Sequence, residues 1–453
     1  MQYRHRRLLA GVSVAVAAAL ALAACGGGTS GDGPSSGGGD EPTGETKNVI
    51  FWQQKFEDYQ QEWFKKNVDA FNASQSEVHV EYLVVPADAW NQKLQAAQAA
   101  GQQPDIATTN YGNVKPGVAQ GKFLALDDYV SADSLADIKE NVADFVTVDG
   151  KYYAYPMLVE PSTVLYYRAD LAEAAGLDPD SPPADWAELV EWATALTTGD
   201  VKGITIASVA PELGWSSWGL QYNACGHLPI ADDWSKAAAT EPCYEDLLNL
   251  YKTLYQDNLM PQTPKVGYTD ALPYGEGEVA MMVNGSWAVG QLKNDYADVI
   301  ENTRVAAFPT IDGKPGTTAT LGGWTLTLDA KSKAPEAAAS FIEYLLGGDP
   351  AIMADFFKTT GFSKYTVRTS VDEALASDPE ASADPFMKLI SEDVVSLGKA
   401  EPAYPWDVAL AMGTAIEAAM KGTAEVSAAL GTADAAINDV IQKQSLAGTA
   451  PTS

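Results

Sequence analysis

The sequence predicts an α/β fold built from two interwoven domains. Between residues 49 and 108, short apolar strands alternate with segments whose apolar side chains recur at helical spacing, which is typical of a parallel sheet covered by helices. About 400 residues follow the N-terminal segment, more than one hydrophobic core usually accommodates. The sequence has no fixed-period repeat and no internal low-complexity linker, so we expect the chain to cross between the domains.

Local patterns place the individual elements. The apolar run 49–52 predicts a first strand, and apolar residues from Trp63 to Phe71 recur at helical spacing in a helix over 60–71. Asp185 is suited to cap a helix that starts at the next residue. Further helices are expected at 88–100, 185–197, 243–258, 334–346, 350–357 and 408–443. Further strands are expected at 78–85, 104–108, 152–158, 162–167, 202–207, 279–283, 304–308 and 323–328.

The N-terminal segment has the features of an export signal. Basic residues precede an apolar run, Leu8 to Ala24, that is too short to favour a stable membrane span. The tetrad Leu-Ala-Ala-Cys that ends at Cys25 resembles the lipobox of a bacterial lipoprotein, in which the cysteine receives the lipid. We therefore expect a signal peptide over 1–24 and a lipid on Cys25, with the mature chain at the extracellular face of the membrane. An ordinary secretory signal with an incidental cysteine is the alternative.

A flexible tether is expected over 25–47. After the cysteine this segment contains no aromatic or large aliphatic residue, so it cannot bury enough surface to offset the entropy of ordering. Such a coil reaches about 25 Å. No later run of about 18 uninterrupted apolar residues predicts a second membrane segment.

The composition favours an uncharged ligand. The net charge is −31, and removing the predicted signal peptide leaves 26 basic and 60 acidic residues. Such an acidic surface argues against binding to nucleic acid or to anionic lipid. Anionic ligands are usually held by arginine, and beyond the signal peptide the only arginines are Arg168, Arg304 and Arg368. The 11 Trp and 20 Tyr residues offer flat rings with polar edges that suit sugars, although most such residues serve packing.

The cysteines predict a structural disulfide. With Cys25 carrying lipid, Cys225 and Cys243 remain as an even pair in an oxidising compartment. A bond between them would close a modest loop and add about 3 kcal/mol. The three histidines form no ligand cluster with these cysteines, so we expect no zinc.

A series of motifs carries a family resemblance. In chain order they are Pro104–Ile106, Gly150–Leu171, Glu276–Trp287, Gly322–Leu328 and Pro335–Phe341. Their order and spacing resemble those of the extracellular solute-binding proteins, family 1, which serve carbohydrate ABC transporters. The resemblance covers most of the chain after the tether.

The resemblance implies a two-lobe fold like that of periplasmic binding proteins, with the ligand cleft between the lobes. The expected lobes are 48–157 with 309–350, and 158–308 with 351–453. Crossing segments near Met157–Glu160 and Phe308–Pro309 are expected to act as hinges. The resemblance also implies a monomer without catalytic activity or cofactor, whose partners are a carbohydrate and the permease subunits of an ABC importer.

Polar residues after two predicted strands are candidates for ligand contact, because ligands of open α/β sheets lie beyond the carboxyl ends of strands. These residues are Trp52, Gln53 and Gln54 after the first strand, and Thr109, Asn110 and Tyr111 after the third. Each glutamine amide can donate to and accept from hydroxyls, although an exposed helix start would explain the pair equally well. Maltose-type relatives carry an acidic–basic pair where Gly112 and Asn113 stand here, which argues against a maltose-like specificity.

Two carboxylates are candidates by resemblance. Glu160 matches a glutamate that family members place at the hinge, where it can accept two sugar hydroxyls. Glu212, near Trp215 and Trp218, resembles a second cleft carboxylate. Paired carboxylates also occur in glycosidases, so a secreted carbohydrate-active enzyme is the alternative of another class, although no motif supports hydrolysis. A receptor for another polar solute, such as a glycerophospho-compound, is the alternative within binding proteins.

The aromatic candidates are ranked by their match to the family. Trp287 matches the stacking ring of the motif that ends there, and Trp406 lies where relatives place another ring. Trp215 and Trp218 come next, then Trp324, behind a glycine at Gly323 that permits close backbone approach. The tryptophans expected to serve packing are Trp63, Trp90, Trp186 and Trp192.

Overall fold

The computed structural model of the chain describes residues 46–450. The predicted signal peptide, Cys25 and nearly all of the tether lie outside these residues. The described residues belong to one compact unit. Within them, no helix combines the length and the apolar character needed to cross a membrane.

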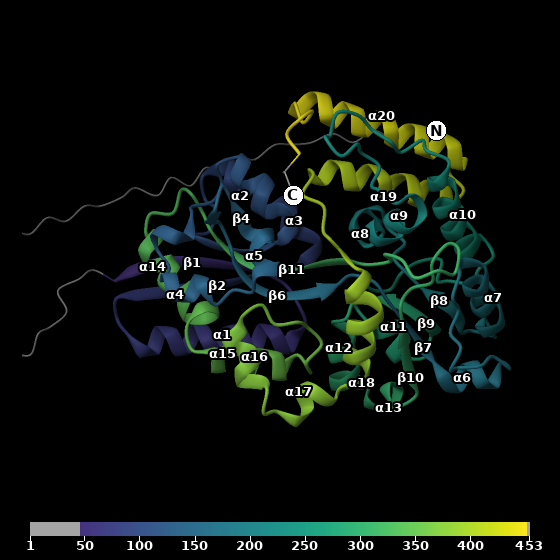
Figure 1. The fold of residues 1–453 in the computed structure, drawn as a ribbon, viewed down its shortest axis with the longest axis horizontal. Helices are drawn as coiled ribbons and strands as arrows, with labels where there is room; N and C mark the ends of the chain where they lie inside the picture. Colours follow the sequence, from purple (N-terminus) through teal and green to yellow (C-terminus); the bar gives the residue numbers. More distant parts are fainter. Residues whose placement is uncertain (1–45, 451–453) are drawn as a thin grey trace, which may run out of the picture. The chain divides into compact units, whose positions relative to one another are not determined.

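The first of the two larger sheets contains six strands, in the order β12-β11-β3-β1-β2 with β6 also paired to β11 (Figure 1). Its strands are β1 (Lys47–Gln54), β2 (Val78–Val85), β3 (Ile106–Asn110), β6 (Tyr155–Pro161), β11 (Thr320–Leu328) and β12 (Lys399–Ala400). As predicted, β1 runs parallel to β2 and β3. Because β11 runs antiparallel to β3 and β6, its start lies at the same edge as the carboxyl ends of β1 and β3.

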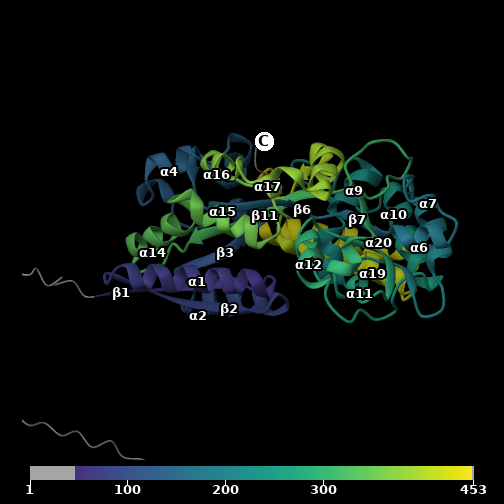
Figure 2. The same cartoon turned by 90° about the horizontal axis from the view of Figure 1, so that it is seen from below.

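Helices cover both faces of this sheet (Figure 2). On one face, the Phe51 ring centroid lies 5.9 Å from that of Phe64 and 5.7 Å from that of Phe341. On the other, Trp52 packs with Trp90. The elements around this sheet are α1 (Asp58–Ser74), η1 (Ala87–Ala89), α2 (Trp90–Ala100), α3 (Tyr111–Ala119), η2 (Leu126–Asp128), α4 (Ala132–Ala136), α5 (Glu140–Val146), β4 (Thr147–Val148), β5 (Lys151–Tyr152), α14 (Pro335–Ile342), η3 (Glu343–Gly347), α15 (Pro350–Thr359) and α16 (Thr369–Leu375).

The second larger sheet has the order β10-β7-β9-β8. Its strands are β7 (Val164–Arg168), β8 (Lys202–Thr205), β9 (Val279–Asn284) and β10 (Thr303–Ala306).

Side chains of β7 alternate between two cores, with Leu165 and Tyr167 in one and Val164 and Tyr166 in the other. The first core contains α7 (Trp186–Leu196), α8 (Ala210–Ser216), α9 (Trp218–Cys225), α10 (Cys243–Gln256), α19 (Trp406–Met420) and α20 (Val426–Gln444). Around the second lie α11 (Leu272–Gly275), α12 (Ala288–Asp295), α13 (Ala297–Ile300), α18 (Pro385–Leu389) and η4 (Ile390–Val394). The remaining elements are α6 (Ala169–Ala174), α17 (Pro379–Ala383) and η5 (Val395–Leu397).

The chain crosses repeatedly between the two sheets. Ser162 and Thr163 join β6 of the first sheet to β7 of the second, and residues 307–319 join β10 to β11. Residues 401–405 lead from β12 to α19. The predicted crossing at Met157–Glu160 is therefore misplaced, since these residues lie inside β6 and pair with β11.

The lobe boundary expected at residue 350 also differs from the structure. Trp63 of α1 packs against Phe356 of α15, with ring centroids 4.9 Å apart. Val371 and Leu375 of α16 belong to the same core. The core around the first sheet thus continues past residue 350, because apolar side chains of α15 and α16 pack into it.

The helix expected at 408–443 is two helices, α19 and α20. The break contains Gly422, whose φ of +69° lies in the left-handed region that glycine adopts without strain. At another predicted helix start, Asp185 caps α7 as expected, accepting a hydrogen bond from the Glu188 amide at 2.8 Å.

The predicted disulfide is confirmed. Cys225, the last residue of α9, is bonded to Cys243, the first residue of α10, with an S–S distance of 2.03 Å. The tryptophans assigned to packing are also buried, namely Trp63, Trp90, Trp186 and Trp192.

Candidate functional site

Polar groups of both sheets meet at the short crossing between β6 and β7. Tyr268 Oη donates to the carbonyl of Ser162 at 2.9 Å, and the Ser286 amide after β9 donates to the carbonyl of Pro161 at 3.2 Å. Ser162 Oγ lies 3.0 Å from Thr320 Oγ1 at the start of β11. The ends of β6 and β9 and the start of β11 therefore lie together, with the crossing segment between them.

Glu160, the predicted hinge carboxylate, is part of a buried ion pair. Its Oε2 accepts a hydrogen bond from Lys364 Nζ at 2.7 Å, and both residues are less than a tenth exposed. The backbone positions Lys364, because its neighbour Tyr365 pairs with Val159 along the free edge of β6. Sequence analysis did not identify Lys364, which is 204 residues away in the chain.

A second carboxylate, Glu401, lies beside Glu160. Gly322 of β11 pairs with Glu160 of β6, so the side-chain positions of the pair share one face of the sheet. The Glu401 side chain lies over Gly322, where a Cβ would be only 1.9 Å from its Oε1. The glycine therefore makes room for the carboxylate. Glu401 Oε2 is buried and has no hydrogen-bond partner among the described residues.

The surroundings of these carboxylates disfavour their charged forms. Burial raises the pKa of Glu401 to about 7, with a further increase from nearby Glu160, while the backbone amide of Gly112 opposes the shift. Burial also raises the pKa of Glu57, which follows β1, and Lys364 opposes that shift. Tyr111 donates to the Leu158 carbonyl at 3.0 Å, and burial keeps its pKa well above the ordinary range. We call Glu57, Glu160, Lys364 and Glu401 the acidic cluster.

Three aromatic side chains form a group on the second sheet's side of the crossing. Trp215 lies 5.3 Å from Tyr268 and 6.2 Å from Trp287 between ring centroids. Trp287 Nε1 donates to the Thr269 carbonyl at 3.0 Å, and the ring is 6% exposed. A Cβ at position 285 would lie 1.9 Å from the Trp287 ring, so Gly285 is needed for this packing. Of the two tryptophans in the group, Trp215 is the more exposed.

The other ranked rings lie in different surroundings. Trp218 is buried, with its ring centroid 6.2 Å from that of Tyr404 in the crossing to α19. Trp406 begins α19 and is half-buried against the same core. Trp324 lies 4.9 Å from Phe56 between ring centroids. Its neighbour Gly323 has a φ of +145°, and a Cβ there would lie 2.2 Å from the Leu158 carbonyl oxygen.

The predicted strand-end residues are either buried or half-buried. Gln53 is fully buried, where its Oε1 accepts a hydrogen bond from Tyr82, so it is no exposed helix start. Trp52 faces α2, and Lys93 Nζ lies 5.1 Å from its ring centroid. Gln54 is half-buried at the end of β1. Asn110 pairs with Trp324 in the sheet, and its Oδ1 is buried without a partner among the described residues.

Two further predicted residues, Thr109 and Glu212, have hydrogen-bonding neighbours within the protein. Thr109 Oγ1 lies 2.8 Å from Thr327 Oγ1 inside the first sheet. Glu212, in the first turn of α8, accepts a hydrogen bond from the Tyr268 amide at 2.9 Å. Burial raises the pKa of Glu212. It lines a cavity of about 80 Å³ beside β8 and contacts Tyr268, not the acidic cluster.

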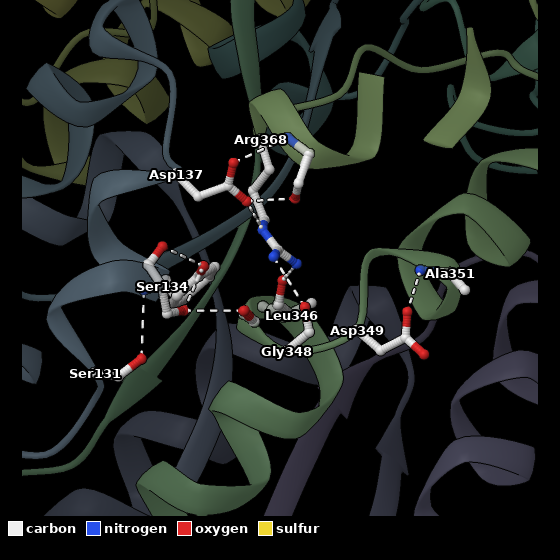
Figure 3. Close-up of polar contacts among 11 residues, drawn as sticks. Ser131, Ser134, Asp137, Leu346, Gly348, Asp349, Ala351 and Arg368 are labelled. Atoms are coloured by element: carbon white, nitrogen blue, oxygen red, sulfur yellow. Dashed lines mark hydrogen bonds and ion pairs between the residues drawn. The ribbon is translucent and has the colours of Figure 1, made fainter. Parts of the chain in front are cut away.

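The arginines of residues 46–450 form their hydrogen bonds within the protein, and Arg368 joins distant segments of the fold. Arg368 donates to Asp137 Oδ2 at 2.7 Å and to the carbonyls of Leu346 and Gly348 at 2.5 and 2.9 Å (Figure 3). Arg168 pairs with Asp170, and Arg304 donates to a backbone carbonyl. None of these contacts involves the acidic cluster, whose one cation, Lys364, is already paired to Glu160.

Buried polar atoms near the crossing lack partners. Among the described residues, those without a hydrogen-bond partner include Asn110 Oδ1, Ser216 Oγ, Gln221 Oε1, Ser286 Oγ and Glu401 Oε2. They lie in β3, in α8 and α9, and just after β9 and β12, and such atoms are costly to bury unless something else satisfies them. This arrangement suits a ligand with several hydroxyl groups. Among residues 46–450, no group of three or more His, Cys, Asp or Glu residues could hold a metal ion.

Sequence reasoning missed Glu57, Lys364, Glu401, Tyr268 and Tyr404. The segment that contains Glu401 carried a signal, since two prolines and Tyr404 follow it before α19 and predict a rigid crossing with an aromatic ring. Lys364 carried none, because only the strand pairing beside β6 brings it to Glu160.

Comparison with known proteins gives consistent matches. Residues 57–349, more than half of the chain, match the family described as bacterial extracellular solute-binding protein. A probable ABC transporter-binding protein of Deinococcus radiodurans is 27% identical over 303 residues, which are 62% of this chain and 68% of that protein. The solved structure of an ABC transporter solute-binding protein of Thermotoga lettingae, bound with α-D-tagatose, is 22% identical with a TM-score of 0.75 over 87% of this chain and 100% of that one. The cyclic α-maltosyl-1,6-maltose binding protein of Arthrobacter globiformis is 26% identical with a TM-score of 0.64, over 88% and 100%.

Proposed function

Because the chain belongs to the bacterial extracellular solute-binding proteins, we propose that it binds a sugar or short oligosaccharide between its two lobes for an ABC importer. The observation that carries the proposal is the set of unpartnered buried polar atoms from elements around both sheets, next to the Trp215–Tyr268–Trp287 group. Hydroxyl groups of a sugar satisfy such atoms, and aromatic rings pack on its apolar face. A solute-binding protein of similar fold has been solved with α-D-tagatose, which supports this choice.

The mechanism is closure of the lobes around the ligand. The polar atoms belong to both sides of the crossing segments, so a ligand that contacts both sides binds the closed form better than the open form. Only this difference in affinity shifts the population toward closure. The closed form then docks on the permease, and no covalent step is required.

The export and anchoring predictions complete the proposal. A lipid on Cys25 and a tether over 25–47 would hold the binding unit within about 25 Å of the membrane. Such a tether raises the effective concentration of the receptor near its permease. Mass spectrometry of the membrane fraction tests this, because a Cys25→Ser variant would lose the lipid and be found in the medium.

The arginine contacts argue against the receptor for a glycerophospho-compound. Each described arginine is hydrogen-bonded within the fold, and the one lysine of the acidic cluster is paired. Phosphate groups are usually gripped by free cationic forks. A carbohydrate without anionic groups therefore fits the site better.

A thermal-shift screen of mono- and oligosaccharides tests the proposed function. A ligand that binds only the folded state raises Tm by mass action. We expect at least one sugar to raise Tm and to be recovered unchanged after long incubation, and glycerol 3-phosphate to have no effect. Absence of any sugar-induced shift would overturn the proposal, and appearance of cleavage products would favour the carbohydrate-active enzyme instead.

A further inference from the structure

The acidic cluster contains more negative charge than binding of hydroxyl groups requires. It contains three carboxylates, Glu57, Glu160 and Glu401, and a single ammonium, Lys364. Lys364 Nζ lies 2.7 Å from Glu160 Oε2 and is 3% exposed, and the same ammonium opposes the raised pKa of Glu57. One ammonium therefore faces three carboxylates, and no cation of the described residues lowers the pKa of Glu401.

Two glycines, Gly322 and Gly112, leave the space that the Glu401 side chain and its neighbouring backbone occupy. The space over Gly322 accommodates its carboxylate, and Gly112 lets the same segment approach α3, since a Cβ at 112 would lie 2.9 Å from the Pro402 carbonyl oxygen. The Glu401 amide also donates to the Leu321 carbonyl at 3.2 Å. Within this fixed position Oε2 is buried and has no partner among the described residues. A charge-assisted hydrogen-bond donor is the partner that a buried carboxylate oxygen favours most.

The Gly112 amide of α3 opposes the raised pKa of Glu401 but carries no charge, and the other neighbours of Glu401 do not provide a charge-assisted donor. The Tyr111 hydroxyl of α3 donates to the Leu158 carbonyl, and Lys364 donates to Glu160 of β6. Glu57 accepts from Gln60. The raised pKa of Glu401 agrees with this geometry, because both burial and the Glu160 charge make its ionised form costly. A cation placed between Glu401 and Glu160 would remove that cost.

Resting on the proposed function, we propose that the ligand is an amino sugar, and that Glu401 together with Glu160 recognises its protonated amine. The amine donates to the unpartnered Oε2 of Glu401, while the unpartnered amide and hydroxyl atoms of Asn110, Ser216 and Ser286 remain for neutral hydroxyls. This changes the expectation of an uncharged ligand, which considered only the scarcity of arginine. A ligand with both an ammonium and hydroxyls uses both kinds of group at the site.

Sugars that differ only at the 2-position test the amino-sugar proposal directly. Calorimetry at pH 6 compares each gluco-, galacto- and manno-configured sugar, as monomer and oligomer, in its 2-hydroxy, 2-amino and 2-acetamido forms. We expect the 2-amino form to bind at least tenfold more tightly than both neutral forms. Glu401→Gln should reduce this preference to less than twofold. Asp355→Asn, which removes an exposed carboxylate elsewhere, should keep the full preference.

The outcomes separate the two proposals. If a neutral form binds as tightly as the amino form, or if Glu401→Gln retains the preference, the amino-sugar proposal is wrong while the sugar-binding function stands. If no form binds, the proposed function fails and the amino-sugar proposal falls with it.

Proton release gives a readout that a structural role of Glu401 would not produce. The pKa of Glu401 is raised to about 7, so at pH 6 the carboxyl is mostly protonated before binding. A bound ammonium favours the carboxylate and expels that proton, so binding should release close to one proton at pH 6. Calorimetry in two buffers of different ionisation enthalpy measures this release, which Glu401→Gln should abolish. Zero release by the wild-type protein would contradict the proposal.

Discussion

Two buried charge clusters of this protein are built in opposite ways. The Arg368 guanidinium donates to Asp137 and to two backbone carbonyls, and Asp137 also accepts from the Ser370 amide and hydroxyl. These hydrogen bonds, which outweigh burial, hold the pKa of Asp137 below its ordinary value. Glu401 has a buried oxygen without a partner among the described residues and a raised pKa. We call Arg368 with Asp137 the closed cluster, because its charged groups are hydrogen-bonded within the protein and stabilise the fold. We call the acidic cluster around Glu401 the open cluster, because it has a buried carboxylate oxygen without a partner among the described residues.

Removing the Arg368 side chain from the closed cluster should have the largest effect on the free energy of unfolding. Arg368→Met removes the guanidinium and leaves Asp137 and the carbonyls of Leu346 and Gly348 without their donor. Loss of one partner of a buried pair costs about 3–5 kcal/mol. Chemical denaturation at pH 7 measures this loss of unfolding free energy. A change below about 1 kcal/mol would show that the cluster is not structural.

The pH dependence of stability should separate the two clusters by sign. The folded pKa of Glu401 is raised from 4.5 to about 7. Between these values the unfolded chain ionises first, so the folded state loses stability as pH rises, by about 3 kcal/mol in total. Glu401→Gln removes this loss, and denaturation at pH 4.5 and 7.5 should show the variant gaining on the wild type at the higher pH.

Asp137 should show the opposite trend. Its folded pKa is lowered from 3.8, so its contribution is present above that pH and is lost as pH falls through the folded pKa. Asp137→Asn should therefore lower stability most above about pH 4, and the difference should shrink in acid. If both variants had the same sign of pH dependence, the distinction between closed and open clusters would fail.

A smaller effect is expected where a glycine makes room for the open cluster. Gly322→Ala places a Cβ within 1.9 Å of Glu401 Oε1, and the flexible carboxylate must move. We expect ligand affinity to fall about tenfold, or about 1.4 kcal/mol, with a change in stability below about 1 kcal/mol. Gly431→Ala in α20 is the matched control, because a Cβ there meets nothing within 4 Å and affinity should be unchanged.

The smallest effect is expected for an exposed pair. Lys66 Nζ of α1 lies 2.9 Å from Asp355 Oδ2 of α15, and the two side chains are 68% and 48% exposed. Lys66→Met should change the free energy of unfolding by less than about 0.5 kcal/mol, because solvent screens such pairs. A loss near that of Arg368→Met would mean that burial does not decide the value of charge in this protein.

The same contrast shows what could be predicted from the sequence. Strands and helices were predicted well because their apolar spacing is local, as in β1 and α1. Local spacing does not reveal which core a helix joins, so α15 and α16 were assigned to the second lobe although Phe356 packs on Trp63. The break between α19 and α20 was missed because small residues continue across Gly422.

The candidate site was only partly predictable for a related reason. The resemblance gave Glu160 and Trp287 as candidates, because they lie in motifs continuous in sequence. Lys364 and Glu401 reach Glu160 only through pairing of distant segments with β6 and β11. For the strand-end residue Gln53, the alternative of an exposed helix start is wrong. Gln53 is buried against Tyr82, because side chains alternate along β1 and a polar residue can still face the inside.

The order of the strands has a consequence for how the chain folds. By residue 110 the ribosome has made β1, β2 and β3, yet the strand that pairs beside β3, β11, begins at Thr320. The first sheet is complete only when β12 at Lys399–Ala400 has been synthesised. Contacts so distant in sequence slow folding, since a long loop must close before they form. The first sheet can therefore complete its strand pairing only after most of the chain has been synthesised.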